Sequence, residues 1–304
     1  MLKTLRAATS LCFFAFASIG ASHAQIPELH FFYEKAPQPV EDFSWSNTPQ
    51  NSHIDSPISA KIQHKKFHCK ENRRDIGYLL YEPDLDYQQA PVIYVLGDSA
   101  VGNEYSGLKQ AQTLVEAIEL KLLPPMYVVS LNGGPKAYYD ADKKAQGESA
   151  ALSLISHLDQ QLATVRQRHG RILLGSGEGA RAATRWLFKH PELFARAIAV
   201  NPGMQWEYQN SQQSADSGLN KDNSWQLAFD YALSQSPLKV KLLLLADQQS
   251  PNWPSTTAYA NFLEQLAIAH KLESYQRDAK ISLEKRVTGK GVLWLAPEIA
   301  EIPR

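Results

Sequence analysis

The chain has 304 residues, 44% hydrophobic and 20% charged, which is enough to build one sizeable core. The 31 lysine and arginine residues balance the 31 aspartate and glutamate residues, so the formal net charge is zero. This balance gives no indication of a nucleic-acid partner. The chain also lacks the acidic surplus that would indicate a disordered acidic tail.

Residues 1–24 have the pattern of a signal peptide. Lys3 and Arg6 precede an apolar run, residues 11–19, that is too short to span a bilayer. A small-residue cleavage site ends at Ala24. No later run approaches about 20 apolar residues. We therefore expect an exported protein, secreted or periplasmic, without a membrane span.

Residues 25–60 are rich in proline, serine, asparagine and aromatic residues and show no clear period, which indicates an N-terminal arm that lies over the body or is partly disordered. From residue 61 to residue 304 we expect one domain, with strand-like and helix-like patterns in alternation. The expected strands begin at about Ala60 and continue at 77–83, 91–96, 126–131, 172–174, 195–200, 239–246 and 284–287. The expected helices lie at 108–118, 150–167, 182–190 and 255–270.

Most of these strands are apolar throughout, which predicts a mostly parallel sheet covered by helices on both faces. Residues 204–236 are instead polar and rich in serine and glutamine, with scattered aromatic residues, and we interpret them as an insertion or cap.

His64 and His68 stand four residues apart beside Cys69, which raises the question of a metal site. In a strand, four residues separate two side chains by four rises of about 3.3 Å, too far for one ion. We therefore interpret these histidines as solvated strand positions and expect no metal and no other cofactor. Because Cys12 lies in the signal peptide, Cys69 is left without an intramolecular disulfide partner.

The sequence is organised around residues 171–190. A short apolar run leads into Gly175, Gly177 and Gly179, and a helical pattern follows. This order matches the nucleophile elbow of α/β-hydrolases, G-x-S-x-G, except that Gly177 stands where the serine belongs. The sequence therefore predicts a hydrolase scaffold without its nucleophile.

Residues from about 75 to 291 resemble the esterase family of α/β-hydrolases that includes esterase D and the enterochelin and feruloyl esterases. The resemblance is carried by the elbow and by four other segments, Tyr81-Glu-Pro followed by Pro91-Val-Ile-Tyr-Val-Leu, Leu123-Pro-Pro-Met-Tyr-Val-Val, His190-Pro-Glu-Leu-Phe, and Leu242-Leu-Leu-Leu-Ala-Asp. It implies an α/β-hydrolase fold and an ancestry among carboxylic-ester hydrolases.

The resemblance also implies positions for the catalytic groups. The acid position falls on Asp247, and the nucleophile position falls on Gly177. The histidine position falls on Lys290, within Gly289-Lys-Gly, because no histidine follows His270, which we interpret as a helix position. The oxyanion donors are expected at Glu178 and at the turn that contains Gly97 and Asp98.

Two kinds of function remain open at this point. One is a protein without normal Ser-His-Asp activity that binds a small-molecule ester, a related ligand or a partner protein in the old cleft. The other is an active periplasmic esterase that uses a displaced serine with Asp247. The candidates are Ser176, one residue before the elbow position, and Ser99, whose Gly-Asp-Ser context also resembles the opening block of SGNH hydrolases. The more ordinary interpretation of that context is that Asp98 or Ser99 caps the next helix.

Overall fold

The computed structural model describes residues 43–48, 57–85, 89–98, 102–142, 145–205, 207, 222–235, 237–276, 289–291 and 294. The expected signal peptide, Ser99 and the expected strand at 284–287 lie outside these residues.

The core is an eight-stranded sheet with the order β1-β2-β4-β3-β7-β8-β9-β10. Its strands are β1 (Gln63–Cys69), β2 (Arg74–Tyr81), β3 (Val92–Leu96), β4 (Tyr127–Ser130), β7 (Arg171–Ser176), β8 (Arg196–Val200), β9 (Lys241–Asp247) and β10 (His270–Tyr275). Strands β4, β3, β7, β8, β9 and β10 are parallel, whereas β1 and β2 form an antiparallel edge. The mostly parallel sheet predicted from the apolar runs is therefore confirmed.

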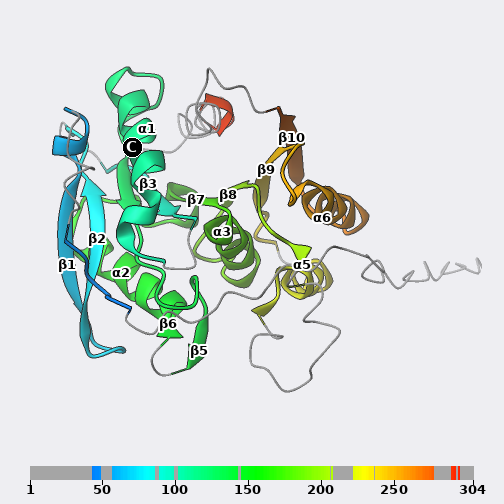
Figure 1. Ribbon diagram of the computed structural model, residues 1–304, viewed down its shortest axis with the longest axis horizontal. Helices are drawn as coiled ribbons and strands as arrows, with labels where there is room; N and C mark the ends of the chain where they lie inside the picture. Colours follow the sequence, from blue (N-terminus) through cyan, green and yellow to red (C-terminus); the bar gives the residue numbers. More distant parts are fainter. Residues whose placement is uncertain are drawn as a thin grey trace, which may run out of the picture.

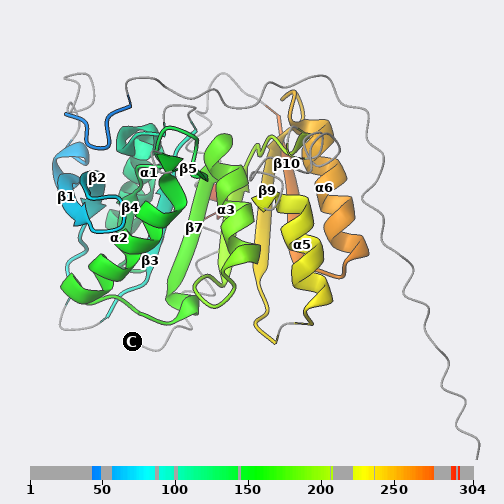
Figure 2. The same ribbon diagram turned by 90° about the horizontal axis from the view of Figure 1, so that it is seen from below.

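Helices cover both faces of the sheet (Figures 1 and 2). Helix α1 (Leu108–Glu119) lies on one face, and α2 (Gly147–Gln161), α3 (Glu178–Lys189), α5 (Ser224–Leu233) and α6 (Trp253–Gln265) lie on the other. The short hairpin of β5 (Asp140–Asp142) and β6 (Ala145–Gln146) precedes α2, and single turns of 3-10 helix lie at Ser59–Lys61, Glu104–Gly107 and Arg168–Gly170. In the part of the chain that the structure describes, no helix is both long and apolar enough to cross a membrane.

Two predicted helices were too long. Helix α2 ends at Gln161 rather than at residue 167, because Leu162 is extended and Thr164 pairs with Ala90 beside the sheet. Helix α6 ends at Gln265 rather than at His270. His270 instead begins β10, where its backbone lies beside Leu242 of β9. Tertiary pairing overrides the local helical pattern in both places.

Residues 43–48 of the N-terminal arm pack against the antiparallel edge. The Gly77 amide donates to the Trp45 carbonyl at 2.7 Å, and the Trp45 ring is buried. Glu104 lies fully buried beneath the arm and accepts hydrogen bonds from the Asn47 backbone amide at 2.7 Å and from the Asn132 side chain at 3.0 Å.

His64 belongs to the same cluster and is not a solvated strand position as predicted. Its Nε2 lies 2.9 Å from Oε1 of Glu104, and its ring stacks on Tyr105. His68, by contrast, is exposed and pairs with Asp75. The difference arises because Glu104 reaches His64 from the turn before α1, a contact that the sequence pattern around β1 does not reveal.

Part of the segment interpreted as an insertion or cap belongs to the core. Helix α5 lies beside α3 (Figure 2), and the Trp225 ring is fully buried against Tyr259 and Phe262 of α6. For residues 224–233 the structure therefore shows a helix of the layer that covers the sheet.

Candidate active site at the elbow between β7 and α3

Gly177 is the single residue between the end of β7 and the start of α3. Its backbone angles are φ 50° and ψ −115°, a conformation that glycine adopts without the steric cost that a serine bears. Its amide donates to the Val200 carbonyl at 2.9 Å, which fixes the elbow to β8. At Gly179 a Cβ atom would lie 2.1 Å from the Leu96 carbonyl oxygen, so α3 starts in direct contact with the end of β3. The chain therefore has the sharp strand-to-helix turn, with a bare glycine at its tip.

The space above Gly177 holds the side chain of Asp98. A Cβ atom at Gly177 would lie 1.9 Å from Oδ1 of Asp98 and 2.5 Å from Oδ2. The Glu178 amide, which is an expected oxyanion donor, donates to the same Oδ1 at 3.2 Å. Partial burial raises the pKa of Asp98 above its ordinary value, and the positive charge of Arg181 opposes that rise. A carboxylate thus stands where a nucleophile would stand.

The Glu178 side chain turns along the helix toward Arg181. The two side chains form an ion pair, and Nη1 of Arg181 also donates to the Gly203 carbonyl at 2.8 Å. The Glu178 carboxylate is therefore neutralised one turn into α3. Its backbone amide is the group that faces the elbow. Behind the turn, the Tyr138 hydroxyl donates to the Gly97 carbonyl at 3.4 Å.

Ser176 lies on the other side of the sheet from this arrangement. Its side chain is buried, and its Oγ accepts a hydrogen bond from Nε2 of Gln110 at 2.9 Å. Gln110 belongs to α1, which covers the face opposite α3. The structure therefore does not bring Ser176 to Asp98, Gly177 or Glu178.

Asp247 is the last residue of β9 and is fully buried. Its amide donates to Oδ1 of Asn201 at 2.7 Å, and its own Oδ1 accepts from the Gln249 amide at 2.9 Å, as in a side-chain-capped turn. Strand β9 is two strands away from β7, which corresponds to about 10 Å. Asp247 is therefore placed at the carboxyl edge of the sheet, two strand spacings from the elbow.

Each of the six histidines in the described ranges has its position fixed elsewhere. His190 lies 2.7 Å from Glu148, His157 stacks on Phe67, and His169 lies just before β7 at the edge opposite the elbow. His64 and His68 belong to β1, and His270 begins β10, five residues before the pairing of Tyr275 with Asp247. Five residues of strand correspond to about 16 Å, so His270 is far from the acid.

Lys290, at the expected histidine position, lies against β10. Its ammonium group donates to the Ser274 carbonyl at 3.0 Å and pairs with Glu273 at 3.2 Å. The Lys290 side chain is therefore engaged by groups of β10. Of the expected site residues, the structure brings together Gly97, Asp98, Gly177 and Glu178. It places Asp247 two strands from the elbow at the carboxyl edge of the sheet, Lys290 against β10, and Ser176 against α1 on the opposite face.

One face of α3 carries a buried charged network that sequence reasoning missed. Its cationic side chains recur at every fourth residue: Arg181, Arg185 and Lys189. The Arg185 guanidinium lies 3.6 Å above the Tyr139 ring centre and donates to the Tyr138 carbonyl at 2.6 Å. The acidic side chains of the network come from three other segments. Arg185 lies near Glu148 and Glu207, and Lys189 pairs with Asp222. The four-residue spacing was the available signal, but it did not reveal that this face is buried.

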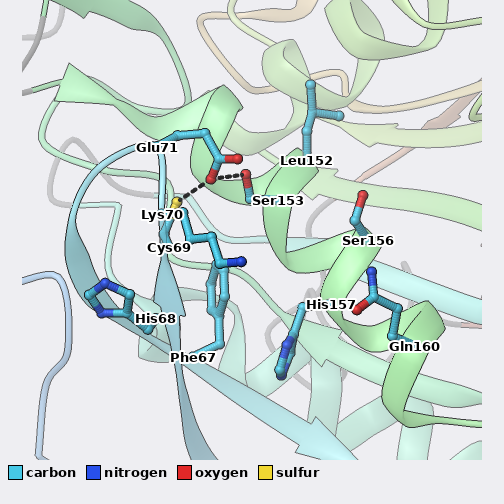
Figure 3. Close-up of a pocket in the computed structure, with 10 residues that line it drawn as sticks. All are labelled: Phe67, His68, Cys69, Lys70, Glu71, Leu152, Ser153, Ser156, His157 and Gln160. Atoms are coloured by element: carbon cyan, nitrogen blue, oxygen red, sulfur yellow. Dashed lines mark hydrogen bonds between the residues drawn. The ribbon is translucent and has the colours of Figure 1, made fainter.

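A separate hollow of about 370 Å³ lies between β1 and α2 (Figure 3). In its lining the Glu71 carboxylate accepts from the Ser153 hydroxyl at 2.8 Å and from the Cys69 thiol at 3.3 Å. Burial raises the pKa of the Cys69 thiol, so the reactive thiolate is scarce. No cluster of metal ligands is found among the residues that the structure covers.

Solved structures of serine hydrolases are similar to this chain. The fluorophosphonate-binding serine hydrolase F of Staphylococcus aureus matches 77% of this chain and 98% of its own length, with 13% identity and a TM-score of 0.65. A ferulic acid esterase matches 78% of this chain and 97% of its own, with 12% identity and a TM-score of 0.65. The S-formylglutathione hydrolase from Agrobacterium tumefaciens matches 79% and 95%, with 14% identity and a TM-score of 0.58.

No protein-family model matches the sequence, and the curated proteins give no significant match. The structural neighbours nevertheless include esterases of the kinds that the sequence resembles. Together with the strand order, they confirm the predicted fold: this chain is an α/β-hydrolase-fold protein.

Proposed function

We propose that the protein is an exported α/β-hydrolase-fold protein that lacks normal Ser-His-Asp esterase activity and uses its cleft to bind a small ester-related ligand or a partner. The observation that carries this proposal is the pair of Asp98 and Gly177. A glycine stands at the tip of the elbow, and a carboxylate fills the space of the absent hydroxyl. The pattern of residues 1–24 is the reason for proposing export.

Acyl transfer by this fold needs three groups in one place. A hydroxyl must attack, an imidazole must take its proton, and free amides must stabilise the oxyanion. At this elbow the amide of Glu178 already donates to Asp98. Loss of the nucleophile or its base alone leaves only the small residual rate that comes from binding and the oxyanion hole. Ligand binding does not require a hydroxyl, an imidazole and free amides in the arrangement that catalysis needs.

The alternative is an esterase with a displaced serine. Ser176 is a poor candidate, because its hydroxyl is buried against Gln110 on the opposite face of the sheet. Ser99 follows the turn that holds Asp98 and stays a prediction, because it lies outside the described residues.

The test is to offer the purified mature protein p-nitrophenyl acetate and methyl ferulate, and to treat it with a fluorophosphonate probe. The serine hydrolase of S. aureus named above serves as the positive control. We expect neither turnover nor covalent labelling. Labelling of a serine, with turnover lost in Ser99→Ala or Ser176→Ala, would establish the alternative. In parallel, a thermal-shift screen with ferulate and other aromatic acids tests ligand binding, because a ligand that binds the folded state raises the melting temperature.

A further inference from the structure

We infer that Asp98 is a built-in plug of the elbow, a side chain that keeps the carbonyl oxygen of any bound ester away from the Glu178 amide. This inference deepens the proposed function and rests on it. It assigns to Asp98 a role that differs from that of an oxyanion-hole residue, because the residue occupies the hole instead of helping to form it.

Asp98 fits closely against Gly177. Both carboxylate oxygens and Cγ of Asp98 would lie within 2.5 Å of a Cβ atom at Gly177. The carboxylate therefore uses the volume that opens only when the elbow residue has no side chain. At Gly179 the atoms in the way belong to the backbone of Leu96 and Gly97, so the steric conflict there is independent of Asp98.

Polar and charged groups also face the Asp98 carboxylate. On α3 these are the Glu178 amide, which donates to it, and Arg181, whose positive charge acts on it while its guanidinium is also paired with the Glu178 side chain. The buried Tyr138 hydroxyl donates to the carbonyl of the preceding residue, Gly97, at 3.4 Å, and the Asp98 charge contributes to the raised pKa of that hydroxyl. The Glu178 amide is therefore directed at a carboxylate, and a second developing negative charge there would be repelled.

The first experiment is a double-mutant cycle in urea unfolding. Gly177→Ala is expected to destabilise the protein through its positive φ and through displacement of the Asp98 carboxylate. In an Asp98→Ala background the second contribution is absent, so we expect the substitution to raise the equilibrium constant for unfolding about fivefold less than it does in the wild-type background. Gly179→Ala is the matched control, because its conflict with Leu96 must persist in both backgrounds. Equal effects of Gly177→Ala in the two backgrounds would overturn the inference.

The second experiment follows the Glu178 amide resonance by NMR while acetate is added, and it does not depend on the stability of the glycine variants. The Asp98 carboxylate is already held against this amide, and a positioned intramolecular group competes at an effective concentration far above that of the added acetate, so the wild-type resonance should stay in place at about 10 mM acetate. In Asp98→Ala the same amide should shift and saturate. Asp98→Asn keeps the shape and the acceptor oxygen, and should resemble wild type.

A shift in the wild-type protein, no shift in Asp98→Ala, or a shift in Asp98→Asn equal to that in Asp98→Ala would each contradict a plug. A different result would overturn the proposed function and leave the inference about Asp98 intact. A labelled serine elsewhere in the chain would overturn that proposal while the Glu178 resonance still reported an occupied elbow.

Discussion

Glu148 gives the sharpest test of the buried network that holds the elbow helix. Its carboxylate is almost fully buried in the first turn of α2 and lies 2.7 Å from Nε2 of His190 and 3.0 Å from Nζ of Lys189. Arg185 lies 3.9 Å away. The perturbation we choose is Glu148→Gln, which keeps the size of the side chain and removes its charge.

The magnitude follows from the pKa of this carboxyl group. Burial alone would raise that pKa, but the His190 hydrogen bond and the charges of Arg185 and Lys189 outweigh burial and lower it from 4.5 to about 2. At about 1.4 kcal/mol for each pH unit, the ionised form stabilises the folded state by about 3 kcal/mol. Because the folded-state pKa is the lower one, this stabilisation is present above pH 4.5 and is lost as the pH falls toward about 2.

The assay is urea unfolding followed by tryptophan fluorescence between pH 7 and pH 3. We expect Glu148→Gln to lower the free energy of unfolding by about 3 kcal/mol at pH 7. We expect the difference in the free energy of unfolding between the variant and wild type to become smaller below pH 4.5. Glu192→Gln is the matched control, since Glu192 also approaches His190, at 3.6 Å, but is exposed. A gap that stays constant with pH, or an equal effect of the control, would refute the reasoning.

Three further outcomes are expected. Glu104→Ala should lower the free energy of unfolding by about 3 to 5 kcal/mol in urea, because it leaves Asn132 and His64 without their buried partner, whereas Glu82→Ala, at an exposed pair, should change it by less than about 1 kcal/mol. Cys69 should react with a thiol reagent at pH 8 at least about tenfold more slowly in the folded protein than in urea, because burial raises its pKa; equal rates would contradict this. Trp225→Ala should lower the free energy of unfolding by about 3 to 5 kcal/mol, and a change below 1 kcal/mol would show that α5 is not part of the core.

The elbow shows what short-range sequence patterns can and cannot predict. Three alternating glycines between an apolar run and a helical pattern were enough to predict the strand, the turn and the helix, because the backbone geometry at Gly177 and the close approach at Gly179 have local signatures. The sequence also showed that the hydroxyl is absent. It did not show what takes its place, because Asp98 is 79 residues away along the chain.

The same division holds elsewhere in the fold. The apolar strands determined a parallel sheet covered on both faces, because such strands must be buried from both sides. The sequence pattern did not determine where each helix ends. Residues up to His270 continue a helical pattern, yet β9 offers a free edge, and pairing with that edge turns His270–Tyr275 into a strand.

By itself, therefore, the sequence determined the scaffold and the absence of a serine at the tip of its elbow, since both depend on short-range patterns of glycine, apolar and polar residues. The tertiary structure alone decided which charges meet inside it: Asp98 over Gly177, Glu104 against His64, and Arg185 among the acidic residues of three other segments. Such contacts join residues that are distant along the chain, and only the packing of the whole sheet and its helices fixes them.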